Sequence, residues 1–267
     1  MVEGKPVMLV TGASSGIGEE SARLCARAGY RMVLAARRFE RLERLAEEIQ
    51  LAGGEALPVG VDLADQVEIQ RLVECAFERY DRIDILLNNA GLGRLGWLEE
   101  LDPVIDIEYQ LRVNLHAVIY LTQAVLPGMI QRRSGHIINL ASMAGMVGTP
   151  TYTIYAASKF AMRGFSEALR REVGVWGIQV SGIYPAGVAN DFGSHTGAQR
   201  KTGMTTPRFL RLSSEDVARA VLRVVRRPRR TVILPTSMHV AVWLNGAFPW
   251  FVDWAVERWF VRPERGR

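Results

Sequence analysis

Short apolar runs alternate with amphipathic stretches along most of this chain. Each run is short enough to be a buried strand, whereas a stretch such as 40–52 places Leu42, Leu45 and Ile49 on one helical face. Strands that alternate with helices are typical of a parallel sheet covered on both faces. The pattern therefore predicts a doubly wound α/β fold with strands near residues 8–10, 32–35, 56–59, 83–87, 136–140, 178–183 and 231–234.

Composition is consistent with one intracellular domain. A chain of 267 residues without repeats or long linkers can bury a single sizeable core, which we assign to residues 1–235, followed by a hydrophobic extension at 236–267. Cys25 and Cys75 imply no disulfide framework, and the N-terminus has no signal-peptide pattern, so we expect a cytoplasmic protein. The net charge of +5 comes from arginines interleaved with acids, which predicts no nucleic-acid binding.

A turn rich in glycine and serine joins the first apolar run to a helix-like stretch. Strand, glycine turn and helix N-terminus form the arrangement that binds a pyrophosphate, because backbone N–H groups and the helix dipole face the anion. We therefore expect the turn to bind a dinucleotide; the alternative is a Gly-Ser turn without a ligand. The candidate contacts are Gly12, Ser14, Ser15, Gly16, Ile17 and Gly18.

Tyr155 and Lys159 are four residues apart, so in a helix they share a face. A nearby ammonium favours the phenolate, and the pairing therefore predicts that Lys159 lowers the pKa of Tyr155 toward the range useful for proton transfer. Lys159 is one of only three lysines in an arginine-rich chain. Most Tyr-x-x-x-Lys pairs are surface contacts between helical neighbours, so the pair alone is weak evidence for catalysis.

Several motifs occur in one order: the glycine turn, Asp62, the run 88–91, Asn114, Ser142 and the Tyr155–Lys159 pair. In this the chain resembles the single-domain oxidoreductases of the short-chain dehydrogenase/reductase (SDR) family, from about residue 5 to 235. The resemblance implies a Rossmann-type, seven-stranded parallel sheet with helices on both faces. It also implies a homodimer or homotetramer and no metal.

The resemblance further implies a catalytic group of Asn114, Ser142, Tyr155 and Lys159. Tyr155 would exchange a proton with the substrate oxygen, and Ser142 would hydrogen-bond the same oxygen. Lys159 would hold the nicotinamide ribose, and Asn114 would kink its helix and place a water. Taken alone, Ser142 reads as a strand-end cap and Asn114 as a tolerated polar residue in a helix. Tyr152 has no lysine four residues on, so we interpret it as a pocket wall.

The end of the second predicted strand indicates the cofactor. NAD-binding folds place an acid there for the ribose 2′-hydroxyl, but this chain has Ala36 followed by Arg37 and Arg38. A guanidinium binds a phosphate with two parallel hydrogen bonds. We therefore predict NADP(H), with Arg37 as the main contact and Arg38 as the secondary one; two solvated arginines at a helix start are the alternative.

Further cofactor contacts are implied by resemblance. Asp62 and Leu63 are expected beside the adenine, with a cap for the next helix as the other reading of Asp62. Asn89, Ala90 and Gly91 are expected along the ribose side, and Asn89 is also expected to stabilise the sheet, or to act as a turn former. After the sixth strand come Pro185, Ala186, Val188 and Asn190, where Ala186 and Asn190 replace the glycine and threonine usual in the family.

Apolar residues dominate the candidate substrate pocket at 93–97, 143–147 and Phe192, and residues 191–212 have the composition of a lid. We therefore expect an NADP(H)-dependent oxidoreductase that interconverts a hydrophobic ketone or aldehyde and its alcohol. Two alternatives remain open. One is an NADP-binding regulatory protein without turnover, and the other is an isomerase or lyase of the same fold.

The extension at 236–267 contains four of the six tryptophans, interrupted by polar residues and a proline that argue against a transmembrane helix. Three interpretations remain open for it: a contact between subunits, a cover for the protein's own pocket, or peripheral attachment to a membrane through tryptophans and arginines.

Overall fold

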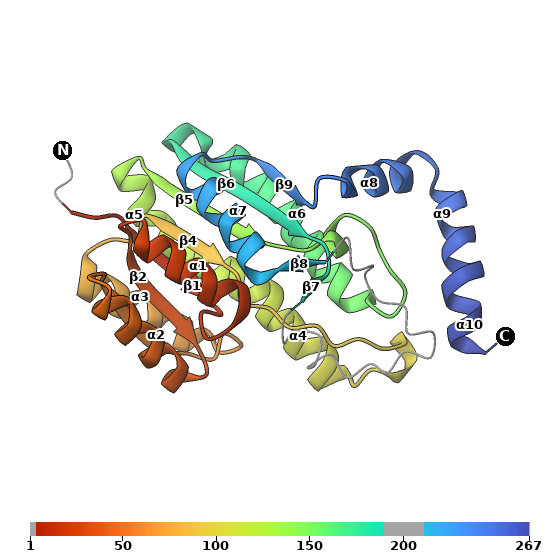
Figure 1. The fold of residues 1–267 in the computed structure, drawn as a ribbon, viewed down its shortest axis with the longest axis horizontal. Helices are drawn as coiled ribbons and strands as arrows, with labels where there is room; N and C mark the ends of the chain where they lie inside the picture. The colour runs from red at the N-terminus through yellow and green to blue at the C-terminus, as the bar shows by residue number, and fades with distance from the viewer. Residues whose placement is uncertain (1–3, 190–210, 267) are drawn as a thin grey trace.

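The computed structural model describes residues 4–189 and 211–266. Seven parallel strands form one sheet in the order β3-β2-β1-β4-β5-β6-β9 (Figure 1). All seven predicted strands lie in this sheet, and their boundaries shift by two residues at most. The strands are β1 (Val7–Thr11), β2 (Arg31–Ala36), β3 (Ala56–Gly60), β4 (Ile85–Asn88), β5 (Gly135–Leu140), β6 (Ile178–Pro185) and β9 (Thr231–Leu234).

Helices cover both faces of the sheet, which confirms the doubly wound, Rossmann-type fold. One face packs against α1 (Gly16–Arg27), α2 (Phe39–Leu51) and α7 (Ser214–Arg226). The other packs against α3 (Gln66–Tyr80), α5 (Ala117–Arg132) and α6 (Thr153–Val173). In Figure 1, α1 and α7 lie in front of the sheet and α6 lies behind it.

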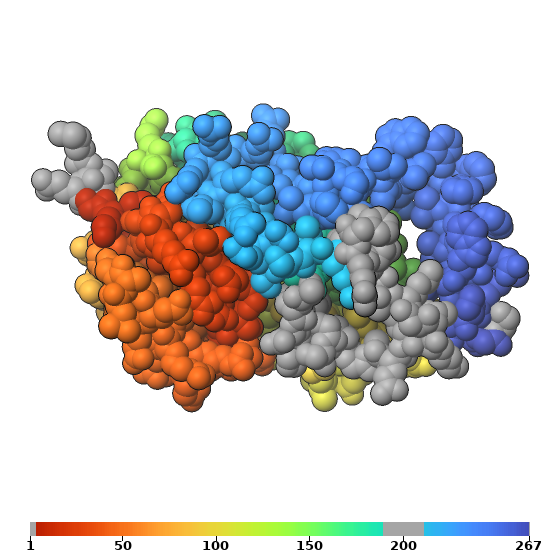
Figure 2. Space-filling model, viewed as in Figure 1, coloured from red at the N-terminus to blue at the C-terminus, as the bar shows by residue number. Residues whose placement is uncertain are grey.

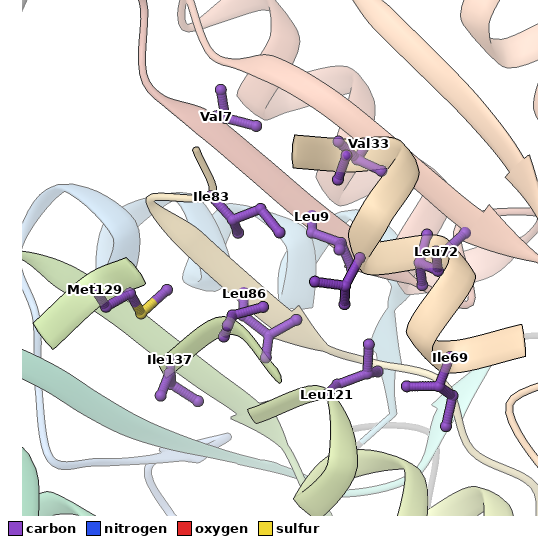
Figure 3. Close-up of a cluster of buried hydrophobic side chains, with 14 of the residues drawn as sticks. Val7, Leu9, Val33, Ile69, Leu72, Ile83, Leu86, Leu121, Met129 and Ile137 are labelled. Carbon is purple, nitrogen blue, oxygen red and sulfur yellow. The ribbon is translucent and has the colours of Figure 1, made fainter. Parts of the chain in front are cut away.

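Alternate side chains of β1 enter different cores. Met8 and Val10 face the α1 side, whereas Leu9 faces the α3 side, as the two-residue period of a strand requires. All three are fully buried, and burying such a side chain contributes about 1.5–3 kcal/mol. Figure 3 shows the core on the α3 side of the sheet, where Leu72 of α3 and Leu121 of α5 pack toward the sheet.

Strand order reverses beside β1, whose neighbours are β2 and β4. In open α/β sheets, ligands bind outside the carboxyl ends of the strands at such a reversal. The segments that follow β1, β4 and β5 therefore meet at one edge, and these segments contain the glycine turn, Asn89 and Ser142.

The long helical run Pro103–Arg132 is irregular before α5. Two π-helical segments, Pro103–Glu108 and Arg112–His116, flank the short helix α4 (Tyr109–Leu111). By length and composition this run is long and apolar enough to cross a membrane. Leu121, Val125 and Met129 of α5 are nevertheless buried against the sheet, so α5 is a core helix of the α/β layers.

Beyond β9 the chain leaves the sheet as the C-terminal arm, residues 238–265, which projects from the body (Figures 1 and 2). It consists of α8 (Met238–Ala247), α9 (Pro249–Val256), a π-helical segment (Glu257–Val261) and α10 (Arg262–Arg265). The remaining elements are a two-stranded sheet, β7 (Val188–Ala189) with β8 (Leu212–Ser213), and 3-10 turns at Leu98–Glu100, Met143–Gly145 and Gly174–Trp176.

Candidate active site

Two loops are hydrogen-bonded to each other at the end of β1. The Thr11 hydroxyl accepts hydrogen bonds from the backbone N–H groups of Asn89 and Ala90, both at 3.0 Å. In return, Asn89 Nδ2 donates to the carbonyl oxygens of Thr11 at 2.7 Å and Gly12 at 3.2 Å. Asn89 therefore holds the glycine turn against the loop after β4, which is a structural role beside the predicted cofactor contact.

The glycine turn leaves no room for larger side chains. Gly12 and Gly16 have φ values of +66° and +60°, a region that favours glycine. A Cβ on Gly18 would lie 2.3 Å from the Gly12 carbonyl oxygen. Ser15 caps α1 without a side-chain hydrogen bond to it, so the N–H groups of the first helical turn keep their capacity to bind an anion. These residues fit a pyrophosphate group.

Arg37 and Arg38 directly follow β2, and their side chains contact different partners. Arg38 donates to the Ser14 hydroxyl at 3.1 Å and to the Ser15 hydroxyl at 2.6 Å. Arg37 Nη1 instead donates to the Tyr109 hydroxyl at 2.7 Å. The strand itself ends in Ala36, without a carboxylate. The Arg38 guanidinium beside two serine hydroxyls, with Arg37 as a second cation after the same strand, fits a phosphate on the adenosine ribose.

Asp62 follows the end of β3 and faces Tyr109. Its carboxylate oxygens each lie 3.4 Å from the Tyr109 hydroxyl, and Oδ1 accepts from the backbone N–H of Ala64. The alternative reading of Asp62 as a helix cap is wrong, because Asp65 caps α3. Leu63 is buried in the core beside α3.

Tyr155 and Lys159 lie on one face of α6, as their spacing predicted. The Lys159 ammonium is 5.6 Å from the centre of the Tyr155 ring and 3.4 Å from the carbonyl oxygen of Leu140. The Tyr155 hydroxyl shares a hydrogen bond with Ser142, which follows β5. Ser142 also accepts from the backbone N–H of Ala144, so its strand-end capping role is present as well.

Asn114 lies in the π-helical segment Arg112–His116, where the predicted irregularity of this helix is found. Its amide exchanges two hydrogen bonds of 2.8 Å with the backbone of Leu92. It also donates to the Ser158 hydroxyl at 3.2 Å, and Ser158 donates to the carbonyl oxygen of Tyr155 at 2.7 Å. Asn114 is therefore linked to the helix that carries the catalytic candidates.

The pKa of Tyr155 is shifted in the direction opposite to our prediction. Burial raises the pKa of Tyr155 to about 12, although the hydrogen bond from Ser142 opposes this shift. Burial also lowers the pKa of Lys159 to about 8. Only 7% of Tyr155 and 3% of Lys159 are exposed, and the loss of water around both groups favours their neutral forms.

Other predicted residues border this site. The backbone N–H of Ala186 donates to the carbonyl oxygen of Leu234 at 2.7 Å, which ties the segment after β6 to β9. Val188 pairs with Leu212. The Tyr152 ring meets the Tyr155 ring edge-on at 6.1 Å, consistent with a wall. Asn190, Phe192 and most of the predicted lid lie outside the described residues.

Three contacting residues were absent from the predicted site: Thr11, Tyr109 and Ser158. Thr11 directly precedes the glycine turn, and Ser158 lies between Tyr155 and Lys159. Both are buried residues with a hydroxyl group. That combination is a usable signal, because buried hydroxyls require partners. Tyr109 had no comparable signal, since its contact with Arg37 joins residues 72 positions apart.

The model of the short chain dehydrogenase family matches residues 6–201 of the chain. This chain belongs to that family. Among its relatives, an oxidoreductase of Staphylococcus saprophyticus is 34% identical over 240 residues, which cover 86% of this chain and 96% of the relative. The protein is therefore an oxidoreductase of the short-chain dehydrogenase family.

Solved structures agree with this assignment. A short-chain dehydrogenase from Sphingobium yanoikuyae in complex with NADPH matches 93% of this short-chain dehydrogenase and 95% of its own chain, with 29% identity and a TM-score of 0.79. A family member from Burkholderia phymatum in complex with NAD matches 92% of this chain and 95% of its own chain, with 26% identity and a TM-score of 0.82. The fold is thus one that holds nicotinamide dinucleotides of either type.

Proposed function

We propose that this short-chain dehydrogenase interconverts a lipophilic ketone or aldehyde and its alcohol with NADP(H). The observation that carries the proposal is the buried Tyr155 phenol, hydrogen-bonded to Ser142 and one helical turn from Lys159. This group lies at the same edge of the sheet as the glycine turn, where a dinucleotide and a substrate carbonyl can meet.

In the reductive direction, Tyr155 donates its proton to the substrate oxygen, and the bound nicotinamide supplies the hydride to the carbonyl carbon. Ser142 donates a hydrogen bond to the same oxygen and stabilises the charge that develops on it. In the oxidative direction, Tyr155 takes the proton back. Its raised pKa keeps the phenol protonated at neutral pH, which is the state that reduction requires.

Lys159 and Asn114 position this chemistry. The Lys159 ammonium lies 3.4 Å from the Leu140 carbonyl oxygen and 5.6 Å from the centre of the Tyr155 ring, and from there it would hold the nicotinamide ribose. A Cβ on Gly91 would meet Asn114 Oδ1 at 3.2 Å and Lys159 Nζ at 3.4 Å. The glycine thus leaves the space beside both side chains open to a ligand.

Cofactor choice rests on charge at the end of β2. Ala36 leaves the ribose 2′ position without a carboxylate, and Arg37 and Arg38 place two cations beside it. The NADPH complex of the Sphingobium yanoikuyae relative supports this choice. Because the Burkholderia phymatum relative was solved with NAD, these side chains carry the argument more than the fold does.

An apolar wall beside Ser142 supports a lipophilic substrate. Met143 and Met146 pack in a cluster with Tyr184, and Met238 and Val242 of α8 lie against the same cluster. Methionines adapt to irregular apolar partners. We therefore propose that residues 236–267 serve as a pocket cover, with α8 as a wall of the substrate site.

The test is NADPH oxidation against a panel of steroids, quinones, acyl ketones and aldehydes, with the parent protein and Tyr155→Phe. We expect one lipophilic class to be reduced, and the variant to lose about 10²–10⁴-fold in kcat with unchanged NADPH affinity. Undiminished turnover by Tyr155→Phe on a substrate of the parent would contradict the mechanism.

A further inference from the structure

The Tyr109 hydroxyl lies between a cation and an anion of the cofactor site. It accepts a hydrogen bond of 2.7 Å from Arg37 Nη1 and faces both carboxylate oxygens of Asp62 at 3.4 Å. Burial raises the pKa of Tyr109, so the phenol stays protonated and can donate to Asp62 while it accepts from Arg37. The residue itself is half-buried at the start of α4.

Arg37 forms no ion pair with an acidic residue among the described residues, although Asp62 contacts the same hydroxyl. A guanidinium has five N–H groups, and the bond to Tyr109 uses one of them. The remaining groups keep their capacity for a phosphate. A neutral phenol therefore holds the Arg37 side chain in place without neutralising its charge.

We propose that Tyr109 is a positioning residue that determines cofactor preference. Its hydroxyl keeps Arg37 apart from Asp62 and directs the guanidinium toward the ribose 2′-phosphate. Without this hydroxyl, Arg37 and Asp62 can form a direct ion pair, and the positive charge available to the phosphate falls. The inference rests on the proposed use of NADP(H).

The inference is tested by calorimetric titration of the full-length protein with two probes. Adenosine 2′,5′-bisphosphate carries the 2′-phosphate, and adenosine 5′-monophosphate lacks it, so the ratio of their affinities reports recognition of that group alone. Tyr109→Phe removes only the hydroxyl. We expect it to lower the ratio about tenfold, as for the loss of a hydrogen bond to a charged group, with little change for the monophosphate.

Two further variants distinguish a loss of Arg37 positioning from a general disturbance of the fold. Asp62→Asn in the Tyr109→Phe background removes the competing carboxylate, and we expect it to restore most of the lost ratio. Tyr30→Phe removes a phenol hydroxyl at the opposite end of the sheet, next to the start of β2, and we expect the parent ratio to remain.

The outcomes separate this inference from the proposed function. A parent protein without preference for the bisphosphate overturns the proposed cofactor, and the inference with it. A parent that prefers the bisphosphate, combined with an unchanged or increased ratio in Tyr109→Phe, overturns the role of Tyr109 alone and leaves NADP(H) in place.

Discussion

The proposed cofactor side and the proposed substrate side of this short-chain dehydrogenase are built by different interactions. On the cofactor side, short polar groups and backbone atoms contact one another, as Thr11 and Asn89 do across two loops. On the substrate side, apolar side chains such as Met143 and Met146 pack against α8. The C-terminal arm leaves large aromatic side chains exposed, among them Trp250 at 70%.

This difference shows which parts of the molecule tolerate change. Backbone hydrogen bonds and glycine contacts place atoms within narrow limits, so a single added carbon is felt there. Methionine-rich packing admits alternative arrangements, so substrate preference can vary while the cofactor site stays constant. We therefore expect mutations on the cofactor side to have larger effects than mutations on the substrate side.

The pH dependence of the catalytic group, which lies between the two sides, is expected to give the largest change. With a Tyr155 pKa near 12, the phenolate fraction rises about tenfold per pH unit, so oxidative kcat/KM is expected to rise about tenfold per pH unit from pH 6 to 8 and to level off above pH 8, where Lys159 loses its proton. Reduction needs the protonated phenol and the charged ammonium. It is expected to be constant below pH 8 and to fall as Lys159, with its pKa near 8, loses its proton.

Rates measured in both directions between pH 6 and 10 test this expectation. An oxidative rate that reaches a plateau below pH 8 would show that the pKa of Tyr155 is lowered, as the sequence alone suggested. Burial would then not be the dominant influence on this phenol.

Arg37→Asp is expected to give the second largest effect. It removes a guanidinium from the end of β2 and places a carboxylate there. The carboxylate repels a 2′-phosphate but accepts a hydrogen bond from a ribose 2′-hydroxyl. We expect NADPH binding to weaken by about 1.5–3 kcal/mol, and NADH to bind equally well or better, in fluorescence titrations of both cofactors. Equal use of both cofactors by the parent would contradict the proposed preference.

Gly18→Ala tests how closely the glycine turn is packed. The new Cβ would lie 2.3 Å from the Gly12 carbonyl oxygen and 2.5 Å from Asn89 Nδ2, so the two loops must separate. We expect the free energy of unfolding to fall by about 1–3 kcal/mol, measured by urea denaturation, and the affinity for either cofactor to fall with it.

Gly164→Ala is the matched control for this substitution. Gly164 lies within α6, and a Cβ there meets nothing within 4 Å. Removing a helical glycine is expected to stabilise the protein by about 0.5–1 kcal/mol without affecting cofactor affinity. Equal losses in both variants would mean that the turn is no more sensitive than an ordinary helix.

The sheet and most of the candidate site were predictable because their signals are local. A buried strand such as β1 is a continuous apolar run, and the glycine turn and the Tyr155–Lys159 pair each lie within a few residues. Their spacing along the chain already decides which side chains share a face. Asn114 had no local signal of its own and was identified through the resemblance to the family; its helix is irregular as expected.

Features that depend on distant contacts or on burial were not predictable in this way. The Arg37–Tyr109 bond joins β2 to α4, and no short pattern encodes it. The pKa of Tyr155 was predicted with the wrong direction, because the sequence shows the neighbouring cation but not the loss of water around both groups. Asn190 lies outside the described residues, so its predicted contact stays a prediction.

The smallest expected effect lies on the substrate side, at the end of the C-terminal arm. Arg265 forms an ion pair of 2.7 Å with Glu99, and its guanidinium lies 3.9 Å from the centre of the Trp97 ring. These contacts join α10 to the loop after β4, which borders the candidate pocket. Arg265→Ala is expected to raise the KM for a lipophilic carbonyl about two- to fivefold, as for the loss of one exposed cation–π contact, with kcat and NADPH affinity unchanged.

Arg262→Ala is the control for this last prediction, because Arg262 pairs with Glu257 of the arm itself and the substitution removes the same charge. If the arm covers the pocket, we expect only Arg265→Ala to change KM, since Arg265 pairs with Glu99 of the body whereas Arg262 pairs within the arm. If both variants leave KM unchanged, the arm does not contribute to substrate binding. Its exposed tryptophans then serve a subunit or a membrane, the other two interpretations that the sequence left open.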